Sequence, residues 1–366
     1  MHFVYCSDNP VFHKNKLENR VWSDRFPGSG WIHILHDLVK KQNFDFSSGD
    51  IALFNIATGK WKSSDVYVIQ DLNSNIGLEL LNLGAIPFAI TCFESPLYAW
   101  EFYDQTTTYC KKYKHQLGFF SENSTNDLFR FPSYYRQELI PLTENSWEAR
   151  KNAVLVAANK YKSNKFYVPK KPGLREISRI IKYLGIKYLS PSYSSALCHS
   201  LSDSRLELIN LLMNDGGLDI YGQGWASLDI LPMKWRDLLS DKMVHSYKGK
   251  CISKFDVISR YKFSICYENT SQYGYCTEKL VDSIVAGSVP IYYGAPDIEN
   301  LIPEHCFIDV RKFSSLNQLG DYLMTLNKIS AYKMLRSGRE YLETPVGDLH
   351  SYEGFADRFL GLILSC

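Results

Sequence analysis

The stretch Phe263–Gly294 limits the possible folds more than any other part of this chain. Phe263–Tyr267 is a short apolar, β-favouring run, which predicts a buried strand. Thr277 suits the N-cap of a helix over Glu278–Ala286. Val289–Tyr292 then predicts a second strand. The stretch therefore predicts a β-loop-α-β unit of the kind found in parallel sheets.

The loop and helix start within this stretch suit a nucleotide diphosphate. Free backbone N–H groups and the positive end of a helix dipole near Thr277 attract a phosphate. Lys279 adds a full positive charge, whereas Glu278 would repel phosphate but can accept hydrogen bonds from ribose hydroxyls. The alternative interpretation is an ordinary βαβ unit with charged surface residues.

The same stretch carries a long ordered motif. It reads Tyr-Glu-Asn at 267–269, Tyr-Cys-Thr-Glu-Lys at 275–279, Ala-Gly-Ser-Val-Pro at 286–290 and Tyr-Gly-Ala-Pro at 293–296. This motif resembles the donor-site signature of the α1,3/4-fucosyltransferases (glycosyltransferase family 10), which use GDP-fucose. The resemblance implies an α/β fold of the GT-B type, with two facing Rossmann-like domains and a C-terminal helix that crosses back to the first domain.

The length and the order of segments agree with two domains. A chain of 366 residues is long enough for two domains of ordinary size. In the N-terminal part, Asp50–Ile56, Asp65–Gln70 and Pro87–Phe93 predict strands, and the alternation with helical patterns predicts a doubly wound parallel sheet. We expect an acceptor-binding domain over 1–145, a donor-binding domain over 146–350 and a C-terminal helix over 351–366.

Composition excludes some classes of function. A net charge of +2 gives no general affinity for nucleic acid. The longest apolar run, Leu80–Phe93, is too short to span a bilayer, and the N-terminus lacks the regions of a signal peptide. We expect a cytoplasmic protein with reduced cysteines and at most peripheral membrane contact. The basic, acid-free stretch Ala149–Arg175 predicts a solvated surface or, alternatively, a docking face for an anionic acceptor lipid.

Glu94 is the candidate catalytic residue. It follows the strand-like Pro87–Phe93 directly, and Ser95 and Pro96 suit the start of a helix. Open α/β sheets bind their ligands at the carboxyl ends of strands. A glutamate that only stabilises the first helical turn is the structural alternative. Phe-Glu-Ser-Pro at 93–96 resembles the family segment that holds the proposed base, so the resemblance implies that Glu94 is the general base.

The resemblance also implies a set of donor-binding residues in the second half. Arg205 lies on a helical pattern before Tyr-Gly-Gln at 221–223, which is the register of a family arginine that contacts the diphosphate, and a guanidinium suits bidentate phosphate binding. The main donor candidates are Arg205, Asn269, Tyr275, Glu278 and Lys279. Further candidates are Tyr221, Lys248 and Glu268, with Lys254 as an alternative to Lys248.

The function that the resemblance implies is an inverting transfer of L-fucose from GDP-β-L-fucose to a glycan hydroxyl. The family's usual product has an α1,3 linkage to O3 of N-acetylglucosamine in an N-acetyllactosamine or Lewis-type glycan; α1,4 linkage and a lipid-linked or lipopolysaccharide acceptor stay open. No Asp-x-Asp pair occurs, so we expect no metal site and no requirement for Mn²⁺ or Mg²⁺. The alternatives are another donor, such as GDP-mannose, and a non-catalytic glycan-binding relative.

Overall fold

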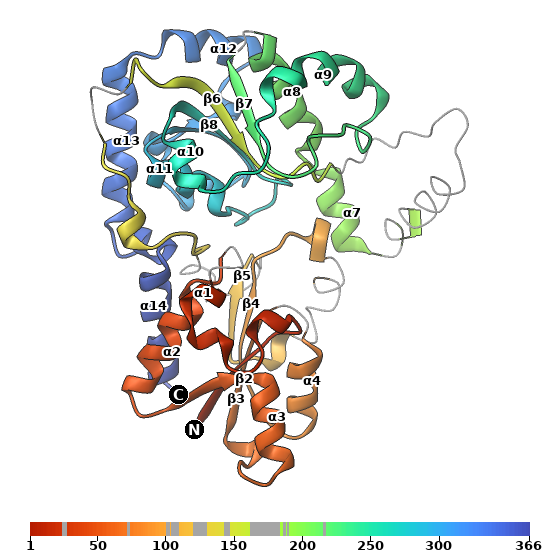
Figure 1. The fold of residues 1–366 in the computed structure, drawn as a ribbon, viewed down its shortest axis with the longest axis vertical. Coiled ribbons are helices and arrows are strands. Elements are labelled where there is room, and N and C mark those ends of the chain that lie inside the picture. Colours follow the sequence, from red (N-terminus) through yellow and green to blue (C-terminus); the bar gives the residue numbers. More distant parts are fainter. Residues whose placement is uncertain are drawn as a thin grey trace. The chain divides into compact units, whose positions relative to one another are not determined.

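The chain forms two compact units in a computed structural model (Figure 1). The structure describes residues 1–23, 28–71, 74–99, 103, 110–119, 130–142, 147–161, 184–185, 188, 190–214 and 217–366. One unit comprises Met1–Gln137 with Leu342–Cys366, and the other comprises Glu138–Tyr341. The predicted boundaries, after residues 145 and 350, therefore lie a few residues later in the chain than these divisions. Most of the basic stretch Ala149–Arg175 lies outside the described residues.

The first unit is built on a parallel five-stranded sheet of order β2-β1-β3-β4-β5. Its strands are β1 (His2–Cys6), β2 (Asp45–Ser48), β3 (Val66–Asp71), β4 (Ile86–Cys92) and β5 (His115–Gly118). Its helices include α1 (Arg20–Ser23), α2 (Trp31–Lys41), α3 (Gly49–Ala57), α4 (Asn75–Asn82) and α14 (Tyr352–Leu364). Apolar strand residues such as Val4, Val68 and Ile90 are fully buried, so this sheet carries the core of the unit.

One predicted element of this unit is wrong. Asp50–Ile56 was expected to be a strand, but it lies within α3. The carboxylate of Asp50 accepts hydrogen bonds from Lys14 N and Ser48 Oγ at the start of the helix. Ala52 is fully buried while Phe54 is 58% exposed. A helix that is covered on one side explains this uneven burial, and the true strand, β2, comes just before it.

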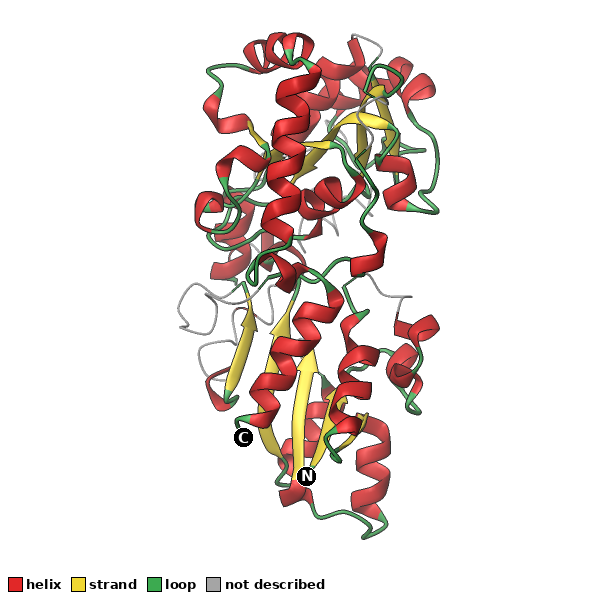
Figure 2. Cartoon of the chain, turned by 90° about the vertical axis from the view of Figure 1, so that its left-hand side faces the viewer, coloured by secondary structure: helices red, strands yellow, loops and turns green. Residues whose placement is uncertain are grey.

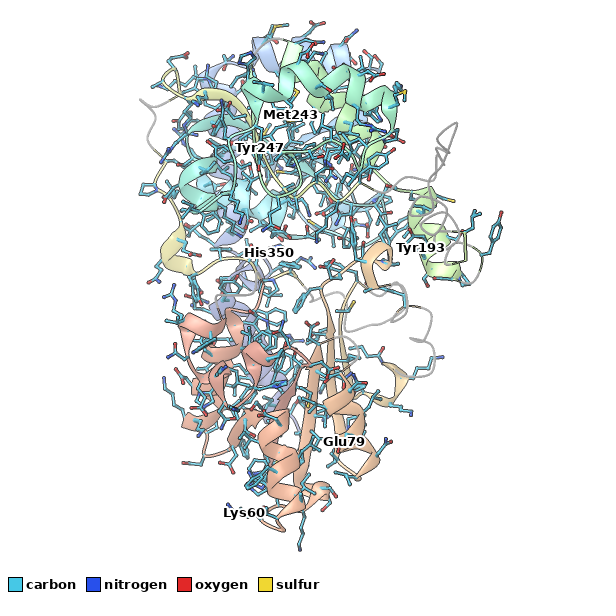
Figure 3. The ribbon with its side chains drawn as sticks, turned by 45° about the vertical axis from the view of Figure 1, so that its right-hand side comes forward. Lys60, Glu79, Tyr193, Met243, Tyr247 and His350 are labelled. Atoms are coloured by element: carbon cyan, nitrogen blue, oxygen red, sulfur yellow. The ribbon has the colours of Figure 1, made fainter. Side chains whose placement is uncertain are left out.

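The C-terminal helix α14 belongs to the first unit, as predicted. It packs against α2, beside which it runs in Figure 1. The ring of Trp31 lies 5.1 Å from that of Phe355 and 5.3 Å from that of Phe359, measured between centroids. His350 lies just before α14 and is labelled in Figure 3. Its side chain is buried, and its Nδ1 lies 3.1 Å from the carbonyl oxygen of Phe131. Aromatic packing therefore holds α14 against α2 of the first unit.

The second unit holds a second parallel five-stranded sheet, of order β10-β9-β8-β6-β7. Its strands are β6 (Lys151–Val156), β7 (Leu218–Tyr221), β8 (Tyr261–Tyr267), β9 (Val289–Tyr293) and β10 (Ile308–Asp309). Its helices include α7 (Pro191–Cys198), α8 (Ser202–Asn214), α9 (Met233–Ser246), α10 (Lys254–Ile258), α11 (Glu278–Ala286), α12 (Leu316–Thr325) and α13 (Lys328–Leu342). Helices surround the strands in both units (Figure 2). The predicted strand-helix-strand unit is confirmed as β8, α11 and β9.

No helix in the described part of the chain combines the length and the apolar character that crossing a membrane requires.

Candidate active site

A buried carboxylate organises the loop between β8 and α11. Glu268 follows β8, and its side chain is 0% exposed. Its Oε1 accepts hydrogen bonds from the backbone N–H of Thr277 at 2.7 Å and from the Thr277 hydroxyl at 2.9 Å. Its Oε2 lies 2.8 Å from Nζ of Lys279, which also donates to Thr277 Oγ1 at 2.6 Å. The three side chains form one closed hydrogen-bonded group, which we call the Glu268 cluster.

This arrangement changes the expected role of the helix start. Thr277 stands at the N-cap of α11, as predicted, but its hydroxyl does not cap the helix. Its backbone N–H, which was expected to face a phosphate, donates to Glu268. Glu278 in the next position lies 3.6 Å from Lys279 Nζ. Burial opposes its ionisation, but Lys279 and Lys254 outweigh this and hold the pKa of Glu278 below its usual value.

The lysines that were expected to supply positive charge are each paired with a carboxylate. Lys279 pairs with Glu268 at 2.8 Å, and Lys254 pairs with Asp282 of α11 at 2.7 Å. Lys248 lies 3.4 Å from Asp219 of β7. A diphosphate at this place would therefore meet lysines whose charges are already partly balanced within the protein.

Tyr221 and Lys248 belong to a group around Asp219. Asp219 accepts hydrogen bonds from Tyr261 Oη at 2.6 Å and Lys151 Nζ at 2.8 Å. The hydroxyl of Tyr221 lies 3.4 Å from that of Tyr261. Lys248 Nζ donates to the carbonyl of His245 at 2.7 Å and lies 3.4 Å from Asp219, so within the described residues the contacts of Tyr221 and Lys248 place them beside Asp219 and not in the Glu268 cluster.

Arg205, Asn269 and Tyr275 gather at the carboxyl end of β8. The backbone N–H of Leu201, just before α8, donates to the carbonyl of Asn269 at 3.1 Å. Arg205 lies in the first turn of α8 and is only 4% exposed. Burial raises the pKa of Tyr267 at the end of β8, and the positive charge of Arg205 opposes that shift, which places Arg205 close to the strand end. Asn269 Nδ2 donates to Tyr275 Oη at 3.4 Å.

A glycine-containing loop brings the segments that follow β6 and β7 into contact. Gly222 follows β7 with φ +135°, and a Cβ there would lie only 2.2 Å from the carbonyl oxygen of Ala157. Asn159 donates from its backbone N–H to Gln223 O at 2.8 Å and from Nδ2 to Gly224 O at 3.1 Å. Glycine therefore allows the segments after β6 and β7 to touch at the edge where parallel sheets bind ligands.

In the first unit, Glu94 stands where the sequence predicted, just beyond β4. The carbonyl of Glu94 accepts a hydrogen bond from Tyr103 Oη at 2.7 Å. The carbonyl of Ser95 accepts from the backbone N–H groups of Tyr98 and Ala99, both at 2.9 Å, so a helical turn begins there as expected. The predicted role of Glu94 as a base stays a prediction.

Asp71 is a second carboxylate at this place, and no motif in the sequence pointed to it. It ends β3 and is paired in register with Thr91 of β4. Its Oδ1 is buried and has no hydrogen-bond partner among the residues that the structure describes. Burial and the nearby negative charge of Glu94 raise the pKa of Asp71 to about 7. Only the order of strands, with β3 beside β4, brings the two carboxylates together.

Over the described ranges, no three or more histidine, cysteine, aspartate or glutamate side chains form a group that could hold a metal ion.

Two parallel sheets, each flanked by helices, form an α/β fold of the GT-B type. A crystal structure of an α1,3-fucosyltransferase with GDP-fucose shares the fold, with a TM-score of 0.51. That comparison covers 100% of this chain and 89% of the other at 14% sequence identity. At this level of identity the likeness concerns the fold alone.

Residues 193–342 match the C-terminal domain of glycosyltransferase family 10 (fucosyltransferase), which confirms for this part of the chain the family resemblance of the donor motif. An α-(1,3)-fucosyltransferase of Helicobacter pylori is 36% identical over 75 residues, covering 20% of this chain and 16% of the relative. An α-(1,4)-fucosyltransferase of Arabidopsis thaliana is 33% identical over 153 residues, covering 37% and 33%. A GDP-fucose protein O-fucosyltransferase 3 of Xenopus tropicalis is 32% identical over 146 residues, covering 39% and 28%.

The alignments span only a minor part of these relatives, between 16% and 33% of their lengths. The match to the family domain contains α8, the loop after β8 and α11, and so it includes every donor candidate named above. Glu94 lies outside the matched domain.

Proposed function

We propose that this chain is an inverting fucosyltransferase that uses GDP-β-L-fucose. The observation that carries the proposal is the family-matched donor motif folded as β8, loop and α11, with a partly exposed lysine in the first turn of the helix. The second unit binds the donor, and the first unit supplies Glu94 and binds the acceptor. Arg205, Asn269, Tyr275, Glu278 and Lys279 form the donor site.

The proposed reaction is a single displacement. An acceptor hydroxyl attacks C1 of fucose on the side opposite to GDP, the bond from C1 to the phosphate oxygen breaks, and the configuration at C1 inverts from β to α. Glu94 takes the proton of the acceptor hydroxyl as the new bond forms, which contributes about 10²–10⁴-fold to the rate. Arg205 and Lys279 stabilise the negative charge that develops on the leaving GDP.

The proposed acceptor is O3 of N-acetylglucosamine in an N-acetyllactosamine-type glycan. The Helicobacter pylori relative supports an α1,3 linkage, and a lipid-linked or lipopolysaccharide carrier with peripheral membrane contact is part of the same proposal. A protein acceptor is the second candidate, because the similarity to GDP-fucose protein O-fucosyltransferase 3 covers a larger share of this chain. Glycan and peptide acceptors offered separately to the same preparation distinguish the two.

The test is acceptor-dependent GDP release from GDP-fucose, compared between the wild type, Glu94→Gln and Glu94→Ala. Both variants are expected to lose about 10²–10⁴-fold in turnover while they still bind GDP. Glu79→Gln is the matched control, because Glu79 is an exposed glutamate on α4 of the same unit (Figure 3). Near-normal turnover of Glu94→Gln would contradict the role of Glu94 as the base.

We also propose that the reaction needs no divalent metal, because charged side chains rather than a metal would balance the diphosphate. Excess EDTA is expected to leave the rate of GDP release unchanged. Loss of turnover in EDTA that Mn²⁺ restores would refute this part of the proposal.

A further inference from the structure

The Glu268 carboxylate is turned away from any ligand. It is fully buried, and Thr277 and Lys279 occupy both of its oxygens. Its backbone is fixed as well, because Glu268 N donates to Tyr293 O of β9 at 2.8 Å. A Cβ on Gly294 would lie 2.6 Å from Cγ of Glu268, so the glycine at this place leaves room for the side chain. Direct contact between Glu268 and a nucleotide, which the sequence suggested, therefore does not fit the structure.

Among the residues that the structure describes, these contacts use two of the three N–H donors of Lys279. A lysine ammonium carries three N–H donors. Glu268 accepts one of them and Thr277 Oγ1 accepts a second, while Glu278 at 3.6 Å is too distant for a hydrogen bond. The Lys279 side chain is 15% exposed, so part of it reaches the surface. Two fixed partners hold the ammonium in one orientation and aim its third N–H.

We propose that Glu268 is a positioning residue for the donor's diphosphate: it holds the Lys279 ammonium charged and oriented, so that the third N–H is available to a phosphate oxygen. This inference rests on the proposed function, because the ligand is the diphosphate of GDP-fucose. Glu268 acts through Lys279 and does not itself touch the nucleotide.

The proposal has a consequence for pH that a simple packing role lacks. Burial lowers the pKa of Lys279, but the charges of Glu268 and Glu278 outweigh burial and raise it well above its ordinary value. Once Glu268 is neutral, burial is opposed mainly by Glu278, so the ammonium loses its proton at a lower pH. A Glu268→Gln variant should therefore lose affinity for GDP as the pH rises.

The other ionisable groups near the pair are either buried or already paired with an opposite charge. Cys266 Sγ donates to the carbonyl of Lys279 at 3.2 Å, and burial raises the pKa of Cys266 to about 12. Burial likewise raises the pKa of Tyr292, which faces Glu268, well above its ordinary value. Tyr275 and Cys276, in the loop before α11, are also buried. On α11 itself, Glu278 has a lowered pKa and is already charged, and Lys254 of α10 is paired with Asp282.

The experiment is calorimetric titration of GDP into the wild type, Glu268→Gln, Lys279→Met and the double variant between pH 6.5 and 9.5. Glu268→Gln is expected to weaken binding about 10–100-fold at pH 9.5, and less at pH 6.5, because a hydrogen bond to a charged group is lost. Lys279→Met should bind weakly with little pH dependence. The double variant should bind GDP no more weakly than Lys279→Met does, because both substitutions act on the same interaction between Lys279 and the diphosphate.

Two outcomes would overturn the inference: wild-type affinity of Glu268→Gln at every pH, or a loss that is the same at every pH. If Glu268→Gln does not fold, Glu268→Asp replaces it; this variant keeps the charge but draws the carboxylate back, and full GDP affinity in it would refute the positioning role. If the wild type itself binds no GDP, the proposed function fails instead. Labelling of the Lys279 amine with acetic anhydride, followed by peptide mass spectrometry, then still reports its ionisation and should begin at lower pH in Glu268→Gln.

Discussion

Two carboxylates with buried oxygen atoms stand at comparable places in the two sheets, and their surroundings differ. Glu268 follows β8 in the second unit and accepts hydrogen bonds from Thr277 and Lys279. Asp71 ends β3 in the first unit, has an unpartnered Oδ1 among the described residues, and faces the negative charge of Glu94. Burial penalises the charge of both groups. A cation and several hydrogen-bond donors offset this penalty for Glu268, whereas one hydrogen bond from Thr91 offsets it only in part for Asp71.

Neighbouring charges and hydrogen-bond donors, rather than burial alone, therefore decide whether such a carboxylate stays charged. Glu268 is part of a compensated ion pair, which is suited to holding another side chain in place. Asp71, with a pKa raised to about 7, changes its charge near neutral pH. It can therefore alter the electrostatic environment of Glu94, the proposed base, over the range in which an enzyme works.

The largest effect on stability is expected from Lys279→Met, which leaves Glu268 buried without its cation. Breaking a buried pair in this way costs about 3–5 kcal/mol. Urea unfolding followed by circular dichroism measures the loss, with the transition of the second unit treated separately if the units unfold in two steps. Lys312→Met is the matched control: Lys312 pairs with Glu304 on the surface, where an ion pair adds little stability.

Adding Glu268→Gln to Lys279→Met separates the loss of the cation from the burial of an uncompensated carboxylate. The double variant has no buried charge at this place and should recover much of the lost stability. Equal stabilities of Lys279→Met and the wild type would contradict the view that Lys279 is the compensating charge for Glu268.

The fold of the donor region could be predicted because its signals are local. The apolar run at Phe263–Tyr267, the threonine before Glu278 and the glycine after Ala286 mark the ends of elements directly. Gly287 has φ +73° at the C-cap of α11, a conformation that favours glycine. The N-terminal unit gave weaker signals: the apolar run of α3 resembled a strand because a short apolar segment has no clear period.

The candidate site could be predicted only in part, because some of its contacts join residues that are far apart in the sequence. The donor motif placed Asn269, Tyr275 and Lys279 on one loop and helix, since these residues are neighbours in sequence. It could not tell that Glu268 points inward, because that orientation depends on the room beside Gly294. Asp71 was out of reach as well: twenty or more residues separate it from Glu94, and only the adjacency of β3 and β4 relates them.

A smaller effect, of opposite sign, is expected from Asp71→Asn. The pKa of Asp71 is raised in the folded state, so the wild type loses stability as the pH rises from about 4 to about 7 and loses no more above that. Asparagine has no charge to bury, and the variant should be more stable than the wild type above pH 7. The gain is at most about 4 kcal/mol, and less to the extent that water reaches the carboxyl group.

Urea unfolding of wild type and variant at pH 5 and pH 8 measures this difference, and Asp8→Asn gives the contrasting control. Burial opposes the ionisation of Asp8, but hydrogen bonds from Asn75, Ser74 and Ile76 at the start of α4 outweigh it and lower the pKa of Asp8. Its substitution should therefore cost stability at pH 8, where Asp71→Asn gains it. If both variants lost stability equally, the carboxylate of Asp71 would have to be compensated as Glu268 is, and its charge could not respond to pH near neutrality.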